Sequence, residues 1–110
     1  MRVHLIRIET IEAYVLGNAR SRPSFEDFLE KLKHASWLKP LDMKDTFAAA
    51  DLLGKGSNQV VFDIAGNAYR MICKYAFGER KVHLFICWIG THAEYTKLCD
   101  NQLQYTINLY

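Results

Sequence analysis

The sequence contains little of what marks several common protein classes. Among its 110 residues there are three cysteines and two prolines, and 14 basic side chains nearly balance 12 acidic ones. Cys73, Cys87 and Cys99 are odd in number and form no CxxC or cysteine–histidine ligand pattern. We therefore expect reduced, mostly buried thiols and no metal site. Because the formal charge is only +2, any anion site must be local.

Long apolar segments are also missing. The longest apolar run, VHLFICWI, is far too short to cross a membrane, and the first ten residues lack the continuous apolar centre of a secretion signal. We expect a cytoplasmic protein for this reason. The length is suited to one domain, residues 1–110, with a single hydrophobic core.

The second half of the sequence carries a strong strand pattern. Three β-type runs, QVVFDI, AYRMICKYAF and KVHLFICWI, are separated by the short segments AGN and GER. This spacing predicts an antiparallel meander. The opening run RVHLIRI predicts a further strand, and the glycine-containing residues 54–58 predict a loop that leads into the meander.

Two helices are predicted in the sequence before this meander. Residues 9–16 have apolar side chains at helical spacing and are followed by the stop signal Gly17. Ser24 is the predicted N-cap of a second helix, and Pro40 prevents its extension. The apolar stripe of this helix is Phe25, Phe28, Leu29 and Leu32. The predicted fold class is α/β in the broad sense (α+β), with N-terminal helices packed on a small, mainly antiparallel sheet.

Alternation along the strands assigns their residues to two faces. On the middle strand the predicted core face is Tyr69, Met71, Cys73, Tyr75 and Phe77. The opposite, open face carries Arg70 and Lys74, about 13 Å apart at the usual strand rise. On the last strand the predicted core residues are Val82, Leu84, Ile86 and Trp88. Lys81 and His83 then share the cationic face.

A short helix is predicted directly after the last strand. Thr91 and Glu94 have the spacing of a capping box, which places His92 in the first turn. Tyr95 follows three residues later and shares a face with His92. Free N–H groups at this helix start favour an anion. The residues predicted to converge on a phosphate are Arg70, Lys74, His92 and Tyr95.

The segment VVFDIAGNAYRMICKYAFGERKVHLFICWIGTHAEYTKL resembles the HigB family of toxins in the RelE-like superfamily. That family carries F-x-I-x-G-N-x-Y-R on a hairpin and G-T-H-x-x-Y after the last strand. The resemblance implies a compact toxin that cleaves messenger RNA, usually on the ribosome, and needs no cofactor. It also implies a helix-turn-helix antitoxin of the HigA type, in a hetero-oligomer that binds operator DNA through the antitoxin.

The chemistry of RNA cleavage fits these residue types. RNA supplies its own nucleophile, the 2′-hydroxyl, so a protein must orient the backbone, move protons and stabilise charge on the phosphate. Arg70, which matches the motif, is suited to the phosphate. His92 is favoured as the base, with Tyr95 or Lys74 as acid or electrostatic support. The predicted RNA-binding residues are Arg80, Lys81, His83 and Lys97.

Two other functions fit the same sequence. One is a non-catalytic RNA- or ribosome-binding module that uses the cationic face. The other is a protein-interaction domain with Trp37, Phe85 and Trp88 as anchors, because aromatic side chains dominate binding hot spots. The strand position of Trp88 favours the core over an interface.

Overall fold

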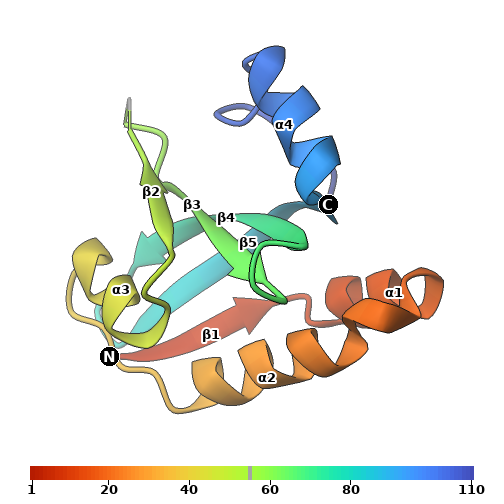
Figure 1. Cartoon of the computed structure of the whole chain (residues 1–110). Coiled ribbons are helices and arrows are strands. Elements are labelled where there is room, and N and C mark those ends of the chain that lie inside the picture. The colour runs from red at the N-terminus through yellow and green to blue at the C-terminus, as the bar shows by residue number, and fades with distance from the viewer. Residues whose placement is uncertain (55) are drawn as a thin grey trace.

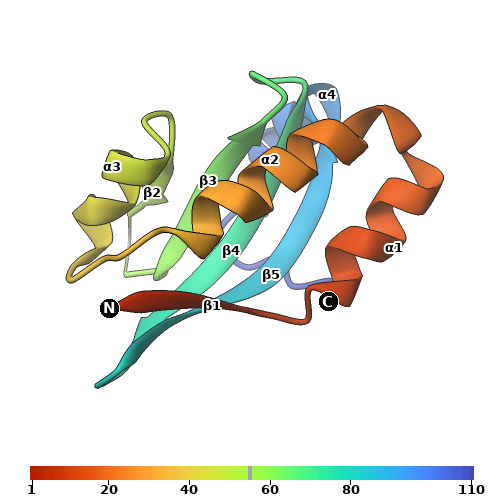
Figure 2. The ribbon, with the colours of Figure 1, turned by 90° about the horizontal axis from the view of Figure 1, so that it is seen from below.

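The computed structural model describes residues 1–54 and 56–110 and contains one five-stranded sheet between two layers (Figures 1 and 2). The strands are β1 (Arg2–Ile6), β2 (Asp51–Leu53), β3 (Gln59–Ile64), β4 (Tyr69–Phe77) and β5 (Lys81–Thr91). The helices are α1 (Glu9–Gly17), α2 (Arg22–Lys33), α3 (Met43–Thr46) and α4 (His92–Asp100). Helices α1 and α2 cover one face of the sheet, and α4 rises from the other face. The predicted α+β fold class is confirmed.

The sheet has the order β1-β5-β4-β3-β2. Strands β3, β4 and β5 form the predicted antiparallel meander, and β1 pairs with β5 in parallel. The pairing of β2 with β3 was not predicted, because a strand of three residues is too short to show an alternating pattern. The loop predicted at residues 54–58 is described only in part, since Lys55 lies outside the described residues.

The first two helices follow the sequence closely, with one error. Helix α1 ends at Gly17 as predicted. The prediction of Ser24 as N-cap is wrong, because α2 begins at Arg22 and Ser21 occupies the N-cap position. Pro23 lies in the first turn of α2, where a proline is tolerated because the first N–H groups have no helical partner. The predicted stripe is confirmed by the burial of Phe25, Phe28 and Leu32 and the partial burial of Leu29.

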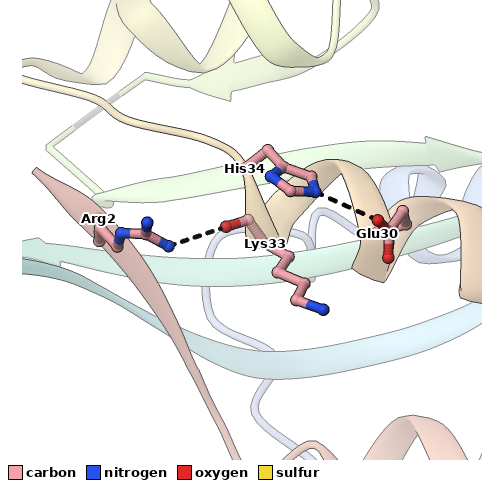
Figure 3. Close-up of polar contacts among 4 residues, drawn as sticks. All are labelled: Arg2, Glu30, Lys33 and His34. Carbon is pink, nitrogen blue, oxygen red and sulfur yellow. Dashed lines mark hydrogen bonds and ion pairs between the residues drawn. The ribbon is translucent and has the colours of Figure 1, made fainter.

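Strand β1 is held against the end of α2 (Figure 3). Nη1 of Arg2 donates to the carbonyl oxygen of Lys33 over 3.4 Å. At the end of α2 itself, Nε2 of His34 lies 3.2 Å from Oε1 of Glu30, four residues earlier. The Arg2 contact ties the edge strand β1, which pairs in parallel with β5, to the end of α2.

A β-bulge at Cys87 changes the faces of β5. Ile72 pairs with Trp88 and the next residue, Cys73, pairs with Ile86, so Cys87 is the extra residue. An extra residue reverses the alternation beyond it. The prediction that Trp88 faces the α1–α2 core is therefore wrong. Trp88 belongs instead to a second buried cluster of Val61, Ile72, Cys87, Trp88 and Leu98.

The face that carries this second cluster is covered, not open as predicted. Besides α4, the cover is residues 101–110, here called the C-terminal strap, which pass behind the sheet towards α1 in Figure 2. The side-chain amide of Gln59 is oriented with its NH2 group towards the strap. This NH2 group donates to the carbonyl oxygens of Gln104 and Tyr105 over 3.1 and 2.9 Å. The N–H of Leu109 donates to the oxygen of Cys87 over 2.8 Å. Ile72, midway between Arg70 and Lys74, is consequently fully buried.

Burial bears out the expectation for two of the three thiols. Cys73 and Cys87 are buried, and Cys99 is partly buried. Desolvation raises the pKa of the Cys73 and Cys87 thiols, so both behave as small apolar side chains. No helix in the described part of the chain is long and apolar enough to span a membrane.

Candidate functional site

The candidate site forms where the β3–β4 hairpin meets the start of α4. Asp63 and Arg70 are direct partners in the register of the hairpin. The N–H of His92 donates to the carbonyl oxygen of Ala68 in the hairpin turn over 3.0 Å. The first helical turn of α4 is thereby held beside the hairpin turn.

The predicted capping box is confirmed. The N–H of Glu94 donates to Oγ1 of Thr91 over 3.2 Å, and the N–H of Thr91 donates to Oε1 of Glu94 over 2.8 Å. Two of the first N–H groups of α4, those of His92 and Glu94, are therefore already bonded. The helix start offers an anion fewer free donors than the sequence predicted.

Arg70 is the centre of the site. Its Nε lies 3.0 Å from Oδ1 of Asp63, and the two side chains are 17% and 21% exposed. This Nε–H makes no well-aligned hydrogen bond with any described residue, so the contact is an ion pair. Of the described residues, none bonds Nη1. The guanidinium is thus held from one side and has donors left for a ligand.

His92 contacts this guanidinium directly. Nη2 of Arg70 lies 3.3 Å from Nδ1 of His92. Because a guanidinium can only donate, Nδ1 is the acceptor in this hydrogen bond, and the tautomer that makes it carries its proton on Nε2. The imidazole is on the solvent side, since His92 is an exposed residue.

Tyr95 presents its ring to the same guanidinium. The ring centroid lies 5.1 Å from Cζ of Arg70, which is within cation–π distance. The pKa of Tyr95 is raised, first by desolvation and then by a hydrogen bond with Cys99. The phenol therefore stays protonated at neutral pH, and its ring supports Arg70.

Lys74, predicted for the same centre, lies elsewhere on the sheet. It is exposed and lines a cavity of about 360 Å³ together with Arg7 and Phe85. The buried Ile72, under α4 and the strap, separates it from Arg70. The structure thus brings Arg70, His92 and Tyr95 together and places Lys74 apart from them.

The predicted RNA-binding residues are spread over the surface. Arg80 and Lys81 are exposed where β4 turns into β5, and Lys97 is exposed on α4. His83 is partly buried, with its ring 5.9 Å from that of His4 on the neighbouring strand. These four do not form one patch with Arg70.

Asp63 is the site residue that sequence reasoning missed. Its motif position was visible, because Asp63 and Arg70 are equidistant from the hairpin turn and must face each other across it. The alternative of a protein-interaction domain loses two of its three anchors, because Trp37 and Trp88 are only 1% and 7% exposed, and the burial of Trp88 agrees with the preference for the core.

A comparison with protein families decides the identity. The HigB toxin family, described as the RelE-like toxic component of a toxin–antitoxin system, matches residues 21–98. The chain belongs to the HigB toxin family. A comparison with curated proteins finds no match.

The family match extends the resemblance seen in the sequence. It begins at the N-cap of α2 and reaches into α4, so it contains Asp63, Arg70, His92 and Tyr95. Strand β1, helix α1 and the strap lie outside it. As the toxic component of a toxin–antitoxin system, this HigB toxin has an antitoxin as its partner.

Proposed function

We propose that this HigB toxin is an endoribonuclease that cleaves messenger RNA on the ribosome, in the cytoplasm, and so inhibits translation. The observation that carries the proposal is the direct contact of Arg70 with both His92 and Tyr95. The three side chains come from β4 and α4, which the bond from the N–H of His92 to Ala68 in the hairpin turn holds together. Such a preorganised cation beside an imidazole suits transfer of a phosphoryl group.

In the proposed reaction the 2′-oxygen of RNA attacks the adjacent phosphorus. The new P–O2′ bond forms as the P–O5′ bond breaks, which gives a 2′,3′-cyclic phosphate and a 5′-hydroxyl. The proton of the 2′-hydroxyl passes to a base, and the departing 5′-oxygen takes up a proton. No other reactant is required.

Arg70 stabilises the charge that develops on the phosphate. Its free terminal N–H groups can bind two phosphate oxygens in a bidentate pair. Asp63 keeps the guanidinium oriented from behind. Tyr95 supports it through its ring, which favours electrostatic support over acid chemistry among the roles that the sequence left open.

His92 moves the protons. While Arg70 donates to Nδ1, the ring carries its proton on Nε2 and can only donate from that atom. When a phosphate accepts the N–H that Nη2 of Arg70 donates to His92, Nδ1 of His92 loses this hydrogen bond and can accept a proton. A pH profile of cleavage by wild type and His92→Gln separates proton transfer from RNA positioning.

The experiment that tests this function is induced expression followed by mapping of messenger RNA 5′ ends. We expect arrested growth and new internal 5′ ends with the wild type, and neither with Arg70→Ala. Arg20→Ala is the matched control, since Arg20 is exposed in the turn between α1 and α2 and is not among the contacts of Arg70. Arrested translation without new 5′ ends would favour the non-catalytic RNA-binding module instead.

We further propose that the antitoxin is a helix-turn-helix protein of the HigA type and that the complex binds operator DNA through it. The family assignment supports the existence of this partner. A neighbouring reading frame with a helix-turn-helix pattern, whose co-expression restores growth and whose product copurifies with the toxin, is the expected result. Growth that stays arrested would contradict this choice of partner.

A further inference from the structure

The cavity beside Lys74 is a candidate binding site that the catalytic proposal does not use. Its lining residues come from β4, β5, the turn between β1 and α1 with the residues on either side of it, and the end of the strap. Its volume is about 360 Å³, which is within the range of small-ligand pockets. The side chains used below are those of Arg7, Lys74, Phe85 and Asn108.

The charges of this cavity favour an anion. Arg7 and Lys74 both line it, and none of the described residues in its lining is acidic. In the described part of the chain neither cation lies within ion-pair distance of a carboxylate. The nearest acidic side chain along α1, Glu9, lines a neighbouring hollow instead. Two cations that take part in none of the ion pairs of the described residues therefore line one open cavity.

The backbone at Arg7 is also unusual. Its φ angle is 62°, in the left-handed region that a residue with a long side chain rarely adopts. Residues held in such conformations are concentrated at binding and catalytic sites. Here the conformation ends β1 and places Arg7 on the rim of the cavity.

An aromatic surface lies next to the cations. Phe85 is 42% exposed and is the direct partner of Lys74 across β4 and β5. An exposed phenyl ring beside a lysine is the combination with which proteins bind single-stranded RNA, because the ring stacks on a base and the cation binds the phosphate. The amide of Asn108 can bond the edge of such a base.

We propose that this cavity is a subsite for one nucleotide of the single-stranded RNA that flanks the cleaved bond. Arg7 and Lys74 bind its phosphate, and Phe85 stacks on its base. The inference rests on the proposed function. Lys74 and Arg70 are four residues apart on one strand, about 13 Å at the usual rise, so a short length of RNA reaches from one to the other across the strap.

The test is direct binding of a short, fluorescently labelled single-stranded RNA, measured by anisotropy. All proteins carry His92→Gln, so that cleavage does not interfere. We expect Lys74→Gln to weaken binding and to lower the slope of log K against log salt by about one. Phe85→Leu keeps an apolar side chain but removes the ring, and we expect it to weaken binding by about fivefold or more.

The matched control is Lys44→Gln. Lys44 is exposed on α3, beside β2 at the other edge of the sheet from β1, and its replacement should leave affinity and salt slope unchanged. Arg7→Asn tests the second cation with a residue that tolerates the left-handed backbone. Folding of each variant is checked by its urea midpoint.

The outcomes separate the subsite from the catalytic proposal. RNA binding that is unchanged in Lys74→Gln and Phe85→Leu overturns the subsite and leaves cleavage at Arg70 untouched. Weakened binding in both supports the subsite even if the wild type proves not to cleave. Displacement of the RNA by free uridine monophosphate at equal concentration would identify a small-ligand site and overturn the assignment to an RNA strand.

Discussion

At the residue scale, the structure explains why a packed strand carries an arginine. Arg70 is mostly buried, but Asp63 supplies a counter-charge and the ring of Tyr95 a favourable contact. Its link to His92 supports a functional role over a purely structural one. A purely structural ion pair would need no imidazole on its solvent side.

Asp63→Asn tests the positioning of Arg70. The substitution removes the counter-charge of a guanidinium that is 17% exposed, and we expect the free energy of unfolding in urea to fall by about 1–3 kcal/mol. RNA cleavage should fall as well, because the guanidinium loses its orientation. Asp45→Asn, on an exposed residue of α3, should change neither. An Asp63→Asn protein with wild-type stability and cleavage would show that Asp63 does not position Arg70.

Tyr95 offers a second residue-scale prediction. If its ring supports Arg70, Tyr95→Phe should keep most of the cleavage rate, whereas Tyr95→Leu should lose about tenfold. Single-turnover cleavage rates of the two variants measure this. Equal, large losses in both would instead assign the chemistry to the phenolic hydroxyl.

At the scale of elements, α4 carries half of the site, so its capping box should matter for stability. Thr91→Ala removes the hydroxyl that accepts from the N–H of Glu94. We expect a loss of about 1 kcal/mol in the free energy of unfolding and weaker RNA cleavage. Thr91→Ser keeps the cap and serves as control. If Thr91→Ala unfolds at the wild-type urea concentration, the cap contributes nothing to α4.

The strap can be tested through the buried amide that fastens it. Gln59→Met is similar in size but removes both bonds to the carbonyls of Gln104 and Tyr105. We expect a loss of about 1–3 kcal/mol in stability and faster hydrogen exchange at the N–H of Leu109, which bonds Cys87. Unchanged exchange there would mean that the strap is held by other contacts.

The elements also show how far the sequence alone could lead. Alternation predicts the meander and the buried face of β4, because each of these strands is long enough to show its period. It cannot predict the bulge at Cys87, where one extra residue turns Trp88 to the other face. The strap has no periodic pattern, since single contacts such as that of Gln59 hold it. The convergence of Arg70, His92 and Tyr95 could be predicted from their motifs and spacing. The separation of Lys74 could not, because it depends on the cover over Ile72, and Asp63 was overlooked although the hairpin register places it opposite Arg70.

At the scale of the whole molecule, several tyrosines bind their protons more tightly when the chain is folded. Burial, followed by the charge of Glu94, raises the pKa of Tyr14 to about 12, and burial raises the pKa of Tyr95 and Tyr110. The unfolded chain loses these protons near pH 10, while the folded chain still holds them. Folding stability therefore decreases as the pH rises from about 10 towards 12.

Urea unfolding across this alkaline range measures the effect. We expect the free energy of unfolding to decline with pH in the wild type and to decline less in Tyr14→Phe. A stability that is constant up to pH 12 would contradict the raised pKa values. We also propose that residues 1–110 unfold as one domain, which the same curves test by the coincidence of fluorescence and circular dichroism transitions.

The central claim for the whole molecule is that Arg70 and His92 cleave RNA through its own 2′-hydroxyl. Chemical analysis of the fragment ends produced by the toxin with ribosomes and messenger RNA tests this most directly. We predict 5′-hydroxyl and 2′,3′-cyclic phosphate ends with the wild type, and no fragments with Arg70→Ala or His92→Gln. Fragments with 5′-phosphate ends, or equal cleavage by the Arg70→Ala protein, would contradict the claim.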